Sequence, residues 1–216
     1  SGIVDENTEN VIKNNENIAK LGEREPQYNR PEIVAKKSEK EKDIQESMEV
    51  TQGKLIIGMD LDIDDDNLRY DVMIYNSLFG GSANSKLFQN VREKASLAYT
   101  ASSSYYRFKN NIFINCGIEI PNYEKALEII KQQIEDMKKG DFTDEEVENA
   151  KKGIIASIKT IDDEQDTEIT YFFSQELSQN KCDIEQYINR IAVVNKENVI
   201  EIANKVSINT IYFLKD

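Results

Sequence analysis

Residues 78–99 have the sequence LFGGSANSKLFQNVREKASLAY, and this stretch carries most of the information about the fold. Its spacing predicts the end of one helix, a break at Gly80 and Gly81, a second amphipathic helix and the beginning of a strand. Arg92 and Tyr99 stand seven positions apart, at the predicted junction between that second helix and the strand. The sequence therefore predicts that both side chains lie close to a helix-to-strand junction.

The second helix of this stretch is expected to begin at Ser82 or Asn84, because these residue types accept hydrogen bonds from the first N–H groups of a helix. Its apolar positions Leu87, Phe88 and Val91 are expected to face the core. Without further information, an arginine near the end of a helix and a tyrosine in a strand are ordinary structural residues.

A second informative feature is the absence of histidine from all 216 residues. The two cysteines, Cys116 and Cys182, are far apart and show no CxxC spacing, so the ligand pairs typical of zinc sites are missing. The same count excludes Ser-His and Cys-His nucleophiles. We therefore expect no metal and no cofactor in this chain. A buried and reduced pair of cysteines is the first expectation, and a disulfide is the alternative.

Charge and composition restrict the class of protein. The chain has 27 basic and 40 acidic side chains and a net charge of −13, whereas nucleic-acid binders need clustered positive charge. Hydrophobic residues make up 39% and charged residues 31%, which is typical of a globular domain with a solvated surface. No apolar run is long enough to cross a bilayer, and the sequence after Ser1 does not resemble a signal peptide. The expected location is cytoplasmic, with neither nucleic acid nor membrane as a partner.

The chain is expected to divide into a tail with a linker and a folded domain. Residues 5–22 show imperfect helical spacing, and residues 23–48, with two prolines and a charged run, predict a linker that becomes an extended segment. The expected boundaries are therefore 1–48 for the tail and linker and 49–216 for the domain.

Within the domain, strands come first, a helical block follows, and a strand returns at the end. The pattern predicts strands over 54–59, 97–108, 112–120 and 207–214, and helices over 68–78, 121–140, 143–158, 169–177, 184–194 and 197–206. The second and third strands are expected to form an antiparallel hairpin. This order of elements predicts an α+β layered domain.

Two motifs follow one another in the opening stretch: SKLF at residues 85–88 and REKASLAY at residues 92–99. In this order they resemble the M16 family of metallopeptidases, the pitrilysin-like inverted zincins, and specifically the second half of such proteins, the inactive domain without zinc. The resemblance covers about residues 50–216, and residues 1–22 look like the tail of a preceding half. The details are most similar to a bacterial branch whose members are often found in pairs.

The resemblance implies a fold and a function. The fold is an antiparallel sheet covered by helices, as in one half of an M16 or LuxS-like metallohydrolase. In the family, one half binds zinc through an inverted HxxEH element, and the other half closes over the peptide substrate. Carried over to this chain, Arg92 and Tyr99 are the expected catalytic residues, which contact the substrate and its developing oxyanion. The zinc belongs to the complementary half, and this chain is expected to be inactive alone.

Other functions stay open at the level of the sequence. Some M16 proteins have lost the zinc motif from both halves, and the parent protein would then be a non-catalytic subunit for substrate binding or assembly. A more remote alternative is a stand-alone interaction module whose strand Tyr99–Tyr106 pairs with peptides. An isolated half also exposes the surface that normally faces its mate, so a homodimer of this chain is a further expectation.

Overall fold

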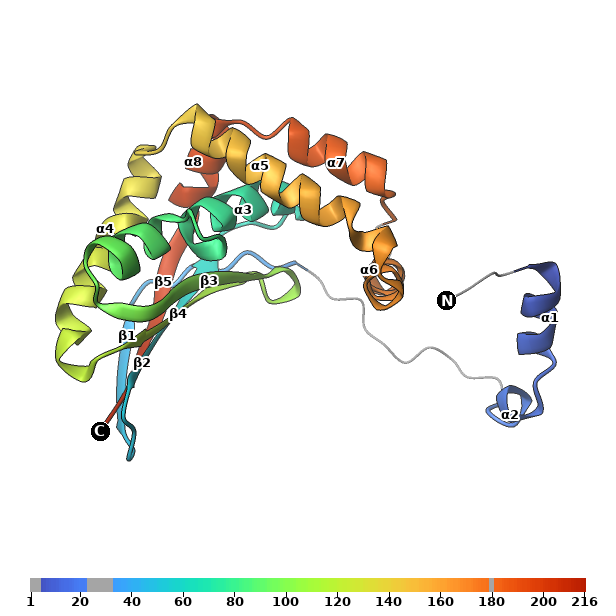
Figure 1. Cartoon of the computed structure of the whole chain (residues 1–216), viewed down its shortest axis with the longest axis horizontal. Coiled ribbons are helices and arrows are strands. Elements are labelled where there is room, and N and C mark those ends of the chain that lie inside the picture. Colours follow the sequence, from blue (N-terminus) through green and yellow to red (C-terminus); the bar gives the residue numbers. More distant parts are fainter. Residues whose placement is uncertain (1–4, 23–32, 179–180) are drawn as a thin grey trace. The chain divides into compact units, whose positions relative to one another are not determined.

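A five-stranded sheet forms the centre of the larger of two units in this chain (Figure 1). The computed structural model describes residues 5–22, 33–178 and 181–216. Residues 33–158 and 184–216 belong to the larger unit, and the other described residues belong to the smaller one. Arg92 and Tyr99 therefore lie in the same unit.

The sheet combines a four-stranded antiparallel part with one parallel edge. Its strands are β1 (Lys42–Ser47), β2 (Gly53–Leu61), β3 (Ala98–Tyr106), β4 (Asn111–Ile118) and β5 (Val206–Lys215), in the order β1-β5-β2-β4-β3. All neighbours pair antiparallel except β1, which runs parallel to β5. The predicted α+β fold, with an antiparallel sheet covered by helices, is confirmed, and β3 and β4 form the predicted hairpin.

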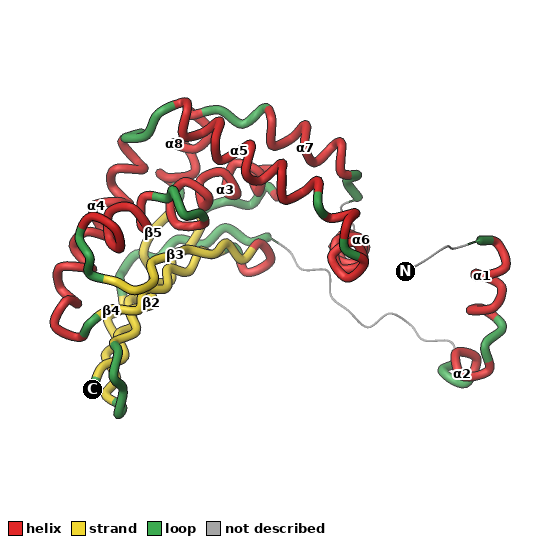
Figure 2. The backbone as a smooth tube through the Cα atoms, viewed as in Figure 1, coloured by secondary structure: helices red, strands yellow, loops and turns green. Residues whose placement is uncertain are grey.

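Helices cover one face of this sheet, as the red and yellow segments in Figure 2 show. They are α3 (Arg69–Asn76), α4 (Tyr123–Lys139), α5 (Asp144–Lys159), α7 (Ile184–Ala192) and α8 (Lys196–Asn204). α8 lies against both α3 and α4, and α3 also contacts β3. These contacts make the two layers that the sequence pattern predicts.

Alternating side chains of the central strands form the core. Leu55 and Ile57 of β2 and Ile112 and Ile114 of β4 are fully buried, because every second side chain of a strand points to the same face. The helices add their own apolar faces, with buried side chains at Val72, Ile74, Ala126, Ile130, Ile134, Met137, Val199, Ile202 and Ala203. The buried face of the sheet is thus the helix-covered face.

The signals at the ends of α4 and α5 act as the sequence predicts. α4 ends at Gly140, whose φ of 73° is left-handed and suits glycine. Before α5, the backbone N–H of Thr143 donates to Glu146 Oε2 at 2.7 Å, and the N–H of Glu146 donates to Thr143 Oγ1 at 3.1 Å. This reciprocal pair is a capping box.

The second helix of the opening stretch differs from the prediction at its beginning. The residue that caps it is Ser85, not Ser82 or Asn84: its Oγ accepts from the N–H of Phe88 at 3.4 Å. Ser85 is only 1% exposed, because it lies under the turn rather than at its tip. The helix then continues with π-type turns over Phe88–Lys94, and Leu87 and Val91 are fully buried while Phe88 is partly exposed.

Strand β1 lies in the segment for which the sequence predicts an extended linker. Its six residues are all exposed, so no alternation of apolar and polar side chains marks them as a strand. The pairing of Asp43 with Ile211 and Gln45 with Phe213 shows that this segment is an edge of the sheet.

Among its described residues, the smaller unit contains the α-helices α1 (Glu6–Lys13), α2 (Glu16–Ala19) and α6 (Gln165–Ser178). α1 begins with a capping box between Asp5 and Thr8, and Gly22, which lies after α2, has a left-handed φ of 67°. In the part of the chain that the structure describes, no helix is both long enough and apolar enough to span a bilayer.

Candidate functional site

Arg92 and Tyr99 line the same pocket, at the junction where the π-helical segment passes into β3. The pocket has a volume of about 360 Å³ and is lined by Arg92, Glu93, Ser96, Leu97, Ala98, Tyr99 and Glu119. The structure thus brings together the two residues that the sequence analysis selects, although it does not by itself assign them a role.

The turn between helix and strand is fixed by two neighbouring residues. Ser96 has a left-handed φ of 52°, an uncommon conformation for a residue other than glycine. The N–H of Leu97 donates to the carbonyl of Val91 at 3.1 Å, and the Leu97 side chain is only 7% exposed. Because the turn is closed by a hydrogen bond and anchored by an apolar side chain, the chain on either side of it has a defined direction.

Tyr99 is the extra residue of a β-bulge. Ala98 pairs with Ile118 and Thr100 with Gly117, so Tyr99 has no partner of its own on β4. A bulge of this kind redirects a side chain and is frequent beside active sites. The Tyr99 side chain is 61% exposed, and its hydroxyl lies 3.4 Å from Oε1 of Glu119.

Arg92 is held beside the helix but stays accessible. Its guanidinium lies 4.5 Å from the centroid of the Phe88 ring, and its Nε lies 3.8 Å from Glu93 Oε1. The side chain is 43% exposed. A cation–π contact and a long ion pair orient the guanidinium without occupying most of its N–H donors.

Glu119 also lines the pocket, and the sequence pattern predicts no role for it. It directly follows β4, and antiparallel pairing with β3 brings it beside Tyr99. The only sequence signal for this contact is the hairpin register, which the bulge shifts by one residue. One guanidinium, one phenol and two carboxylates therefore surround the pocket.

The donor set of the pocket does not fit zinc. Glu93 and Glu119 are its only carboxylates, and its lining includes neither imidazole nor thiolate. Over the described residues as a whole, no group of three potential metal ligands occurs. What the pocket offers instead is two hydrogen-bond donors, a guanidinium and a phenol, and such donors can stabilise a carbonyl oxygen as it gains negative charge.

Both cysteines lie in the described structure as thiols. Cys116 on β4 is buried at 3% exposure, and burial raises the pKa of its thiol to about 12. Cys182 is partly exposed. Neither thiol lies in the pocket, so neither takes part in its chemistry.

Comparison with known proteins identifies relatives of this chain. The family model described as the peptidase M16 inactive domain matches residues 2–154. Probable inactive metalloprotease YmfF of Bacillus subtilis (strain 168) is 38% identical over 176 residues, which are 81% of this chain and 41% of YmfF. Uncharacterized zinc protease YmxG of the same strain is 29% identical over 139 residues, 63% of this chain and 34% of YmxG. The chain spans less than half the length of either relative.

Solved structures share the fold. A conserved protein from Enterococcus faecalis V583 superimposes with a TM-score of 0.74 and 27% identity, over 85% of this chain and 43% of that chain. A peptidase M16 inactive domain from Pseudomonas fluorescens gives a TM-score of 0.70 and 18% identity, over 85% of this chain and 46% of that chain. At 18% identity, the second likeness supports the fold alone.

Proposed function

Because this chain belongs to the M16 peptidase family, as its inactive domain, we propose that it is the non-zinc half of a two-half peptidase. It closes over a peptide substrate and supplies Arg92 and Tyr99 to a composite active site. The zinc ion is held by a complementary half or subunit, and this chain is inactive alone. The observation that carries the proposal is the β-bulge that turns Tyr99 into the same pocket as Arg92.

The proposed roles follow from the chemistry of the two side chains. A zinc ion in the complementary half would supply an activated water, and the carbonyl oxygen of a peptide gains negative charge when water attacks its carbon. A guanidinium and a phenol that donate hydrogen bonds to this oxygen lower the energy of the transition state. Both side chains are exposed enough to reach a substrate held by another half, at 43% for Arg92 and 61% for Tyr99.

The position of β3 supports contact with an extended peptide. Among the described strands it is the edge of the sheet opposite β1, so one side of its backbone has no strand partner. An edge strand can pair with an extended segment through backbone hydrogen bonds, as in β-strand addition. The strand that begins at the pocket could therefore also align the substrate.

A second candidate function is a non-catalytic subunit that binds substrate or assists assembly of an active M16 subunit. The observation in its favour is the 38% identity to YmfF, which is described as a probable inactive metalloprotease. In this case no zinc is present in the parent protein, and Arg92 and Tyr99 only bind peptide.

The test combines this chain with the zinc-bearing M16 half or subunit from the same source and follows cleavage of a quenched fluorescent peptide. Tyr99→Phe and Arg92→Ala are each expected to reduce kcat/KM by about a hundredfold. The matched controls are Tyr106→Phe, at the other end of β3, and Arg190→Ala, on the exposed face of α7. Unchanged hydrolysis in both site variants would refute the catalytic role.

Four further measurements complete the test. Zinc bound to this chain alone, after exchange in zinc-containing buffer, is expected to be far below one equivalent. A complex that binds the peptide without cleaving it would favour the non-catalytic subunit. The proposal also includes a cytoplasmic location and self-association of the isolated half, which fractionation and analytical ultracentrifugation test.

A further inference from the structure

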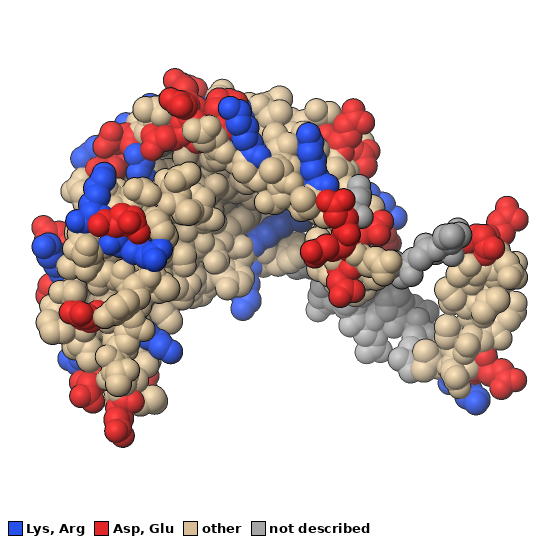
Figure 3. Space-filling model, viewed as in Figure 1, with Lys and Arg blue, Asp and Glu red and all other residues tan. Residues whose placement is uncertain are grey.

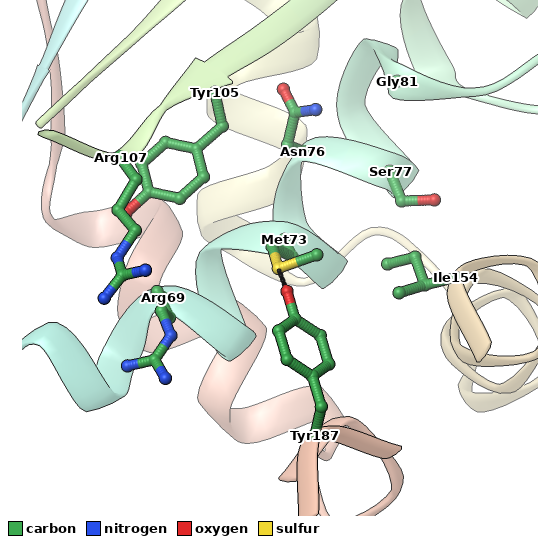
Figure 4. Close-up of a pocket in the computed structure, with 9 residues that line it drawn as sticks. All are labelled: Arg69, Met73, Asn76, Ser77, Gly81, Tyr105, Arg107, Ile154 and Tyr187. Atoms are coloured by element: carbon green, nitrogen blue, oxygen red, sulfur yellow. Dashed lines mark hydrogen bonds between the residues drawn. The ribbon is translucent and has the colours of Figure 1, made fainter. Parts of the chain in front are cut away.

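A second pocket of the larger unit lies between α3, α5, α7 and the end of β3 (Figure 4). Its volume is about 410 Å³, within the usual range for small-ligand sites. Figure 4 shows Arg69, Met73 and Asn76 reaching it from α3, Tyr105 from the end of β3, Arg107 from the turn directly after β3, and Tyr187 from α7. It contains neither Arg92 nor Tyr99 and is separate from the pocket described above.

The lining of this pocket carries two arginines and no carboxylate, in a chain with a net charge of −13. On the face drawn in Figure 3, acidic and basic side chains both appear on the outer surface, and basic side chains also show in the hollow below the helices. Arg69 and Arg107 therefore make the lining of this pocket positive in a protein whose net charge is negative.

Both guanidinium groups are held in place by the carboxylate of Asp66, just outside the pocket. Arg69 Nη1 donates to Asp66 Oδ2 at 2.9 Å, and Arg107 Nε donates to Asp66 Oδ1 at 2.7 Å while its Nη2 bonds to Oδ2. Arg69 is only 4% exposed, and its Nη1 also donates to the Asp66 carbonyl at 3.0 Å. Among the described residues two cations share this carboxylate, so these three side chains have a formal charge of +1 and the guanidinium groups are preorganised.

Polar groups without a partner complete the wall. Within the described structure, the Tyr105 hydroxyl, the Ser77 Oγ and the Asn76 Nδ2 donate no hydrogen bond, and all three residues line the pocket. Burial raises the pKa of Tyr105, so its hydroxyl keeps its proton at neutral pH and can donate. Asn76 is oriented because its Oδ1 accepts from Ser103 Oγ at 2.7 Å.

The opposite wall is apolar. Met73, Ile154 and the ring of Tyr187 line it, and the Tyr187 hydroxyl contacts Met73 Sδ at 2.8 Å, drawn as a dashed line in Figure 4. A ligand that fits both walls has one anionic group and one adjoining apolar group. A formal charge of about +1 can neutralise a monoanion such as a carboxylate, whereas a phosphate dianion would keep one uncompensated charge beside the apolar wall.

We propose that this pocket binds a carboxylate of a peptide, with the anionic group beside Arg107 and Tyr105 and a neighbouring aliphatic side chain against Met73 and Ile154. The carboxylate comes either from the carboxyl terminus of the peptide or from an acidic side chain. The proposal relies on the proposed function only in taking a peptide as the ligand, and binding can be measured with this chain alone.

The test is a titration of the chain labelled with ¹³C at its methionine methyl groups. The chain contains four methionines, and the core residues Met59 and Met137 serve as internal references for Met73. The probes are an acetylated tripeptide that ends in leucine as the free acid, the same peptide as an amide, and an amidated peptide with one internal glutamate. The free acid or the glutamate peptide is expected to shift the Met73 signal, and the neutral amide to bind at least about tenfold more weakly. Comparison of the two acidic probes identifies the source of the carboxylate.

Substitutions test whether the acidic probe binds in this pocket or elsewhere on the surface. Arg107→Gln is expected to weaken binding of the acidic probe by about ten- to a hundredfold, and Arg107→Lys to recover part of the loss. Tyr105→Phe removes only the hydroxyl and is expected to weaken binding severalfold, which keeps the test valid if an Arg107 variant fails to fold. Arg190→Gln, an exposed change of equal charge on α7, controls for general electrostatics.

Tyr99→Phe distinguishes this inference from the proposed function. It is expected to lower hydrolysis in the reconstituted peptidase and to leave the Met73 shifts unchanged. Equal binding of acid and amide, or no selective shift of Met73 with either acidic probe, would overturn the inference. An effect on hydrolysis alone, without these shifts, would leave only the proposed function standing.

Discussion

The Tyr99 hydroxyl lies 3.4 Å from Oε1 of Glu119, and this contact joins the bulged residue of β3 to the residue that follows β4. The distance is at the long end of the range for a hydrogen bond, so the hydroxyl is directed toward Glu119 without being tightly held. In a composite site, Glu119 competes with the substrate for the Tyr99 proton. It also places a negative charge where an oxyanion would form.

Glu119→Gln is therefore expected to raise kcat/KM of the reconstituted peptidase about two- to fivefold, because the substitution removes that charge and weakens the competing acceptor. The measurement is initial-rate hydrolysis of the fluorescent peptide at several substrate concentrations. A decrease in kcat/KM would mean that Glu119 positions Tyr99 instead. Glu93→Gln, also in the pocket but beside Arg92, is the matched control for the removal of one charge.

Gly80→Ala is expected to destabilise the protein by about 1–3 kcal/mol, since an added Cβ would overpack the site. That Cβ would lie 2.5 Å from Ser103 Oγ, 2.7 Å from the Ser103 backbone nitrogen and 2.8 Å from Leu87 Cδ1. Gly153→Ala is the control, because its Cβ would meet nothing within 4 Å. This second change lies within helix α5 and is expected to stabilise by about 0.5–1 kcal/mol. Urea unfolding of both variants measures the difference.

Asp71→Asn is expected to stabilise the protein at pH 7 but not at pH 4. Burial, with the nearby charge of Glu201, raises the pKa of Asp71 from its ordinary value of 3.8 to about 6. A carboxyl whose pKa is higher in the folded state favours folding when protonated, so stability falls as the pH rises from about 4 to about 6. After allowance for solvent screening, the gain at pH 7 is about 1–2 kcal/mol.

Unfolding curves of wild type and Asp71→Asn at both pH values provide the measurement. The two proteins should differ at pH 7 and coincide at pH 4. A loss of stability at pH 7 would show that the charged carboxylate makes a favourable interaction in the folded state.

Alkylation with iodoacetamide at pH 8 is expected to label Cys182 in the native protein and Cys116 only after unfolding. Cys116 is buried and the pKa of its thiol is about 12, so almost no thiolate forms at this pH. Peptide mass spectrometry over a time course distinguishes the two sites. Rapid native labelling of Cys116 would show that β4 opens to solvent far more often than a central strand should.

The sequence predicts those parts of the fold that are determined by residues close together in the chain. The hairpin of β3 and β4 is predictable because alternating residues flank a short polar turn, where Asn110 adopts a left-handed φ of 50°. The capping box of Thr143 and Glu146 is predictable for the same reason, since its partners are three residues apart.

The parts that the sequence does not reveal depend on distant partners. Strand β1 has only exposed residues, and it becomes a strand because β5 lies beside it. The bulge at Tyr99 depends on how the residues of β3 align with those of β4. Composition and spacing do not encode this alignment. Ser85 is preferred over Ser82 as the cap because its position beneath the turn is set by tertiary packing.

The position of β5 also determines when the sheet can be completed during synthesis. β5 follows every other described strand in the sequence, yet it lies between β1 and β2. Until the ribosome has translated beyond residue 215, β1 lacks its neighbour and one edge of β2 stays open to other chains. On the nascent chain, the hairpin of β3 and β4 can form early with β2, whereas closure of the sheet is a late, long-range step.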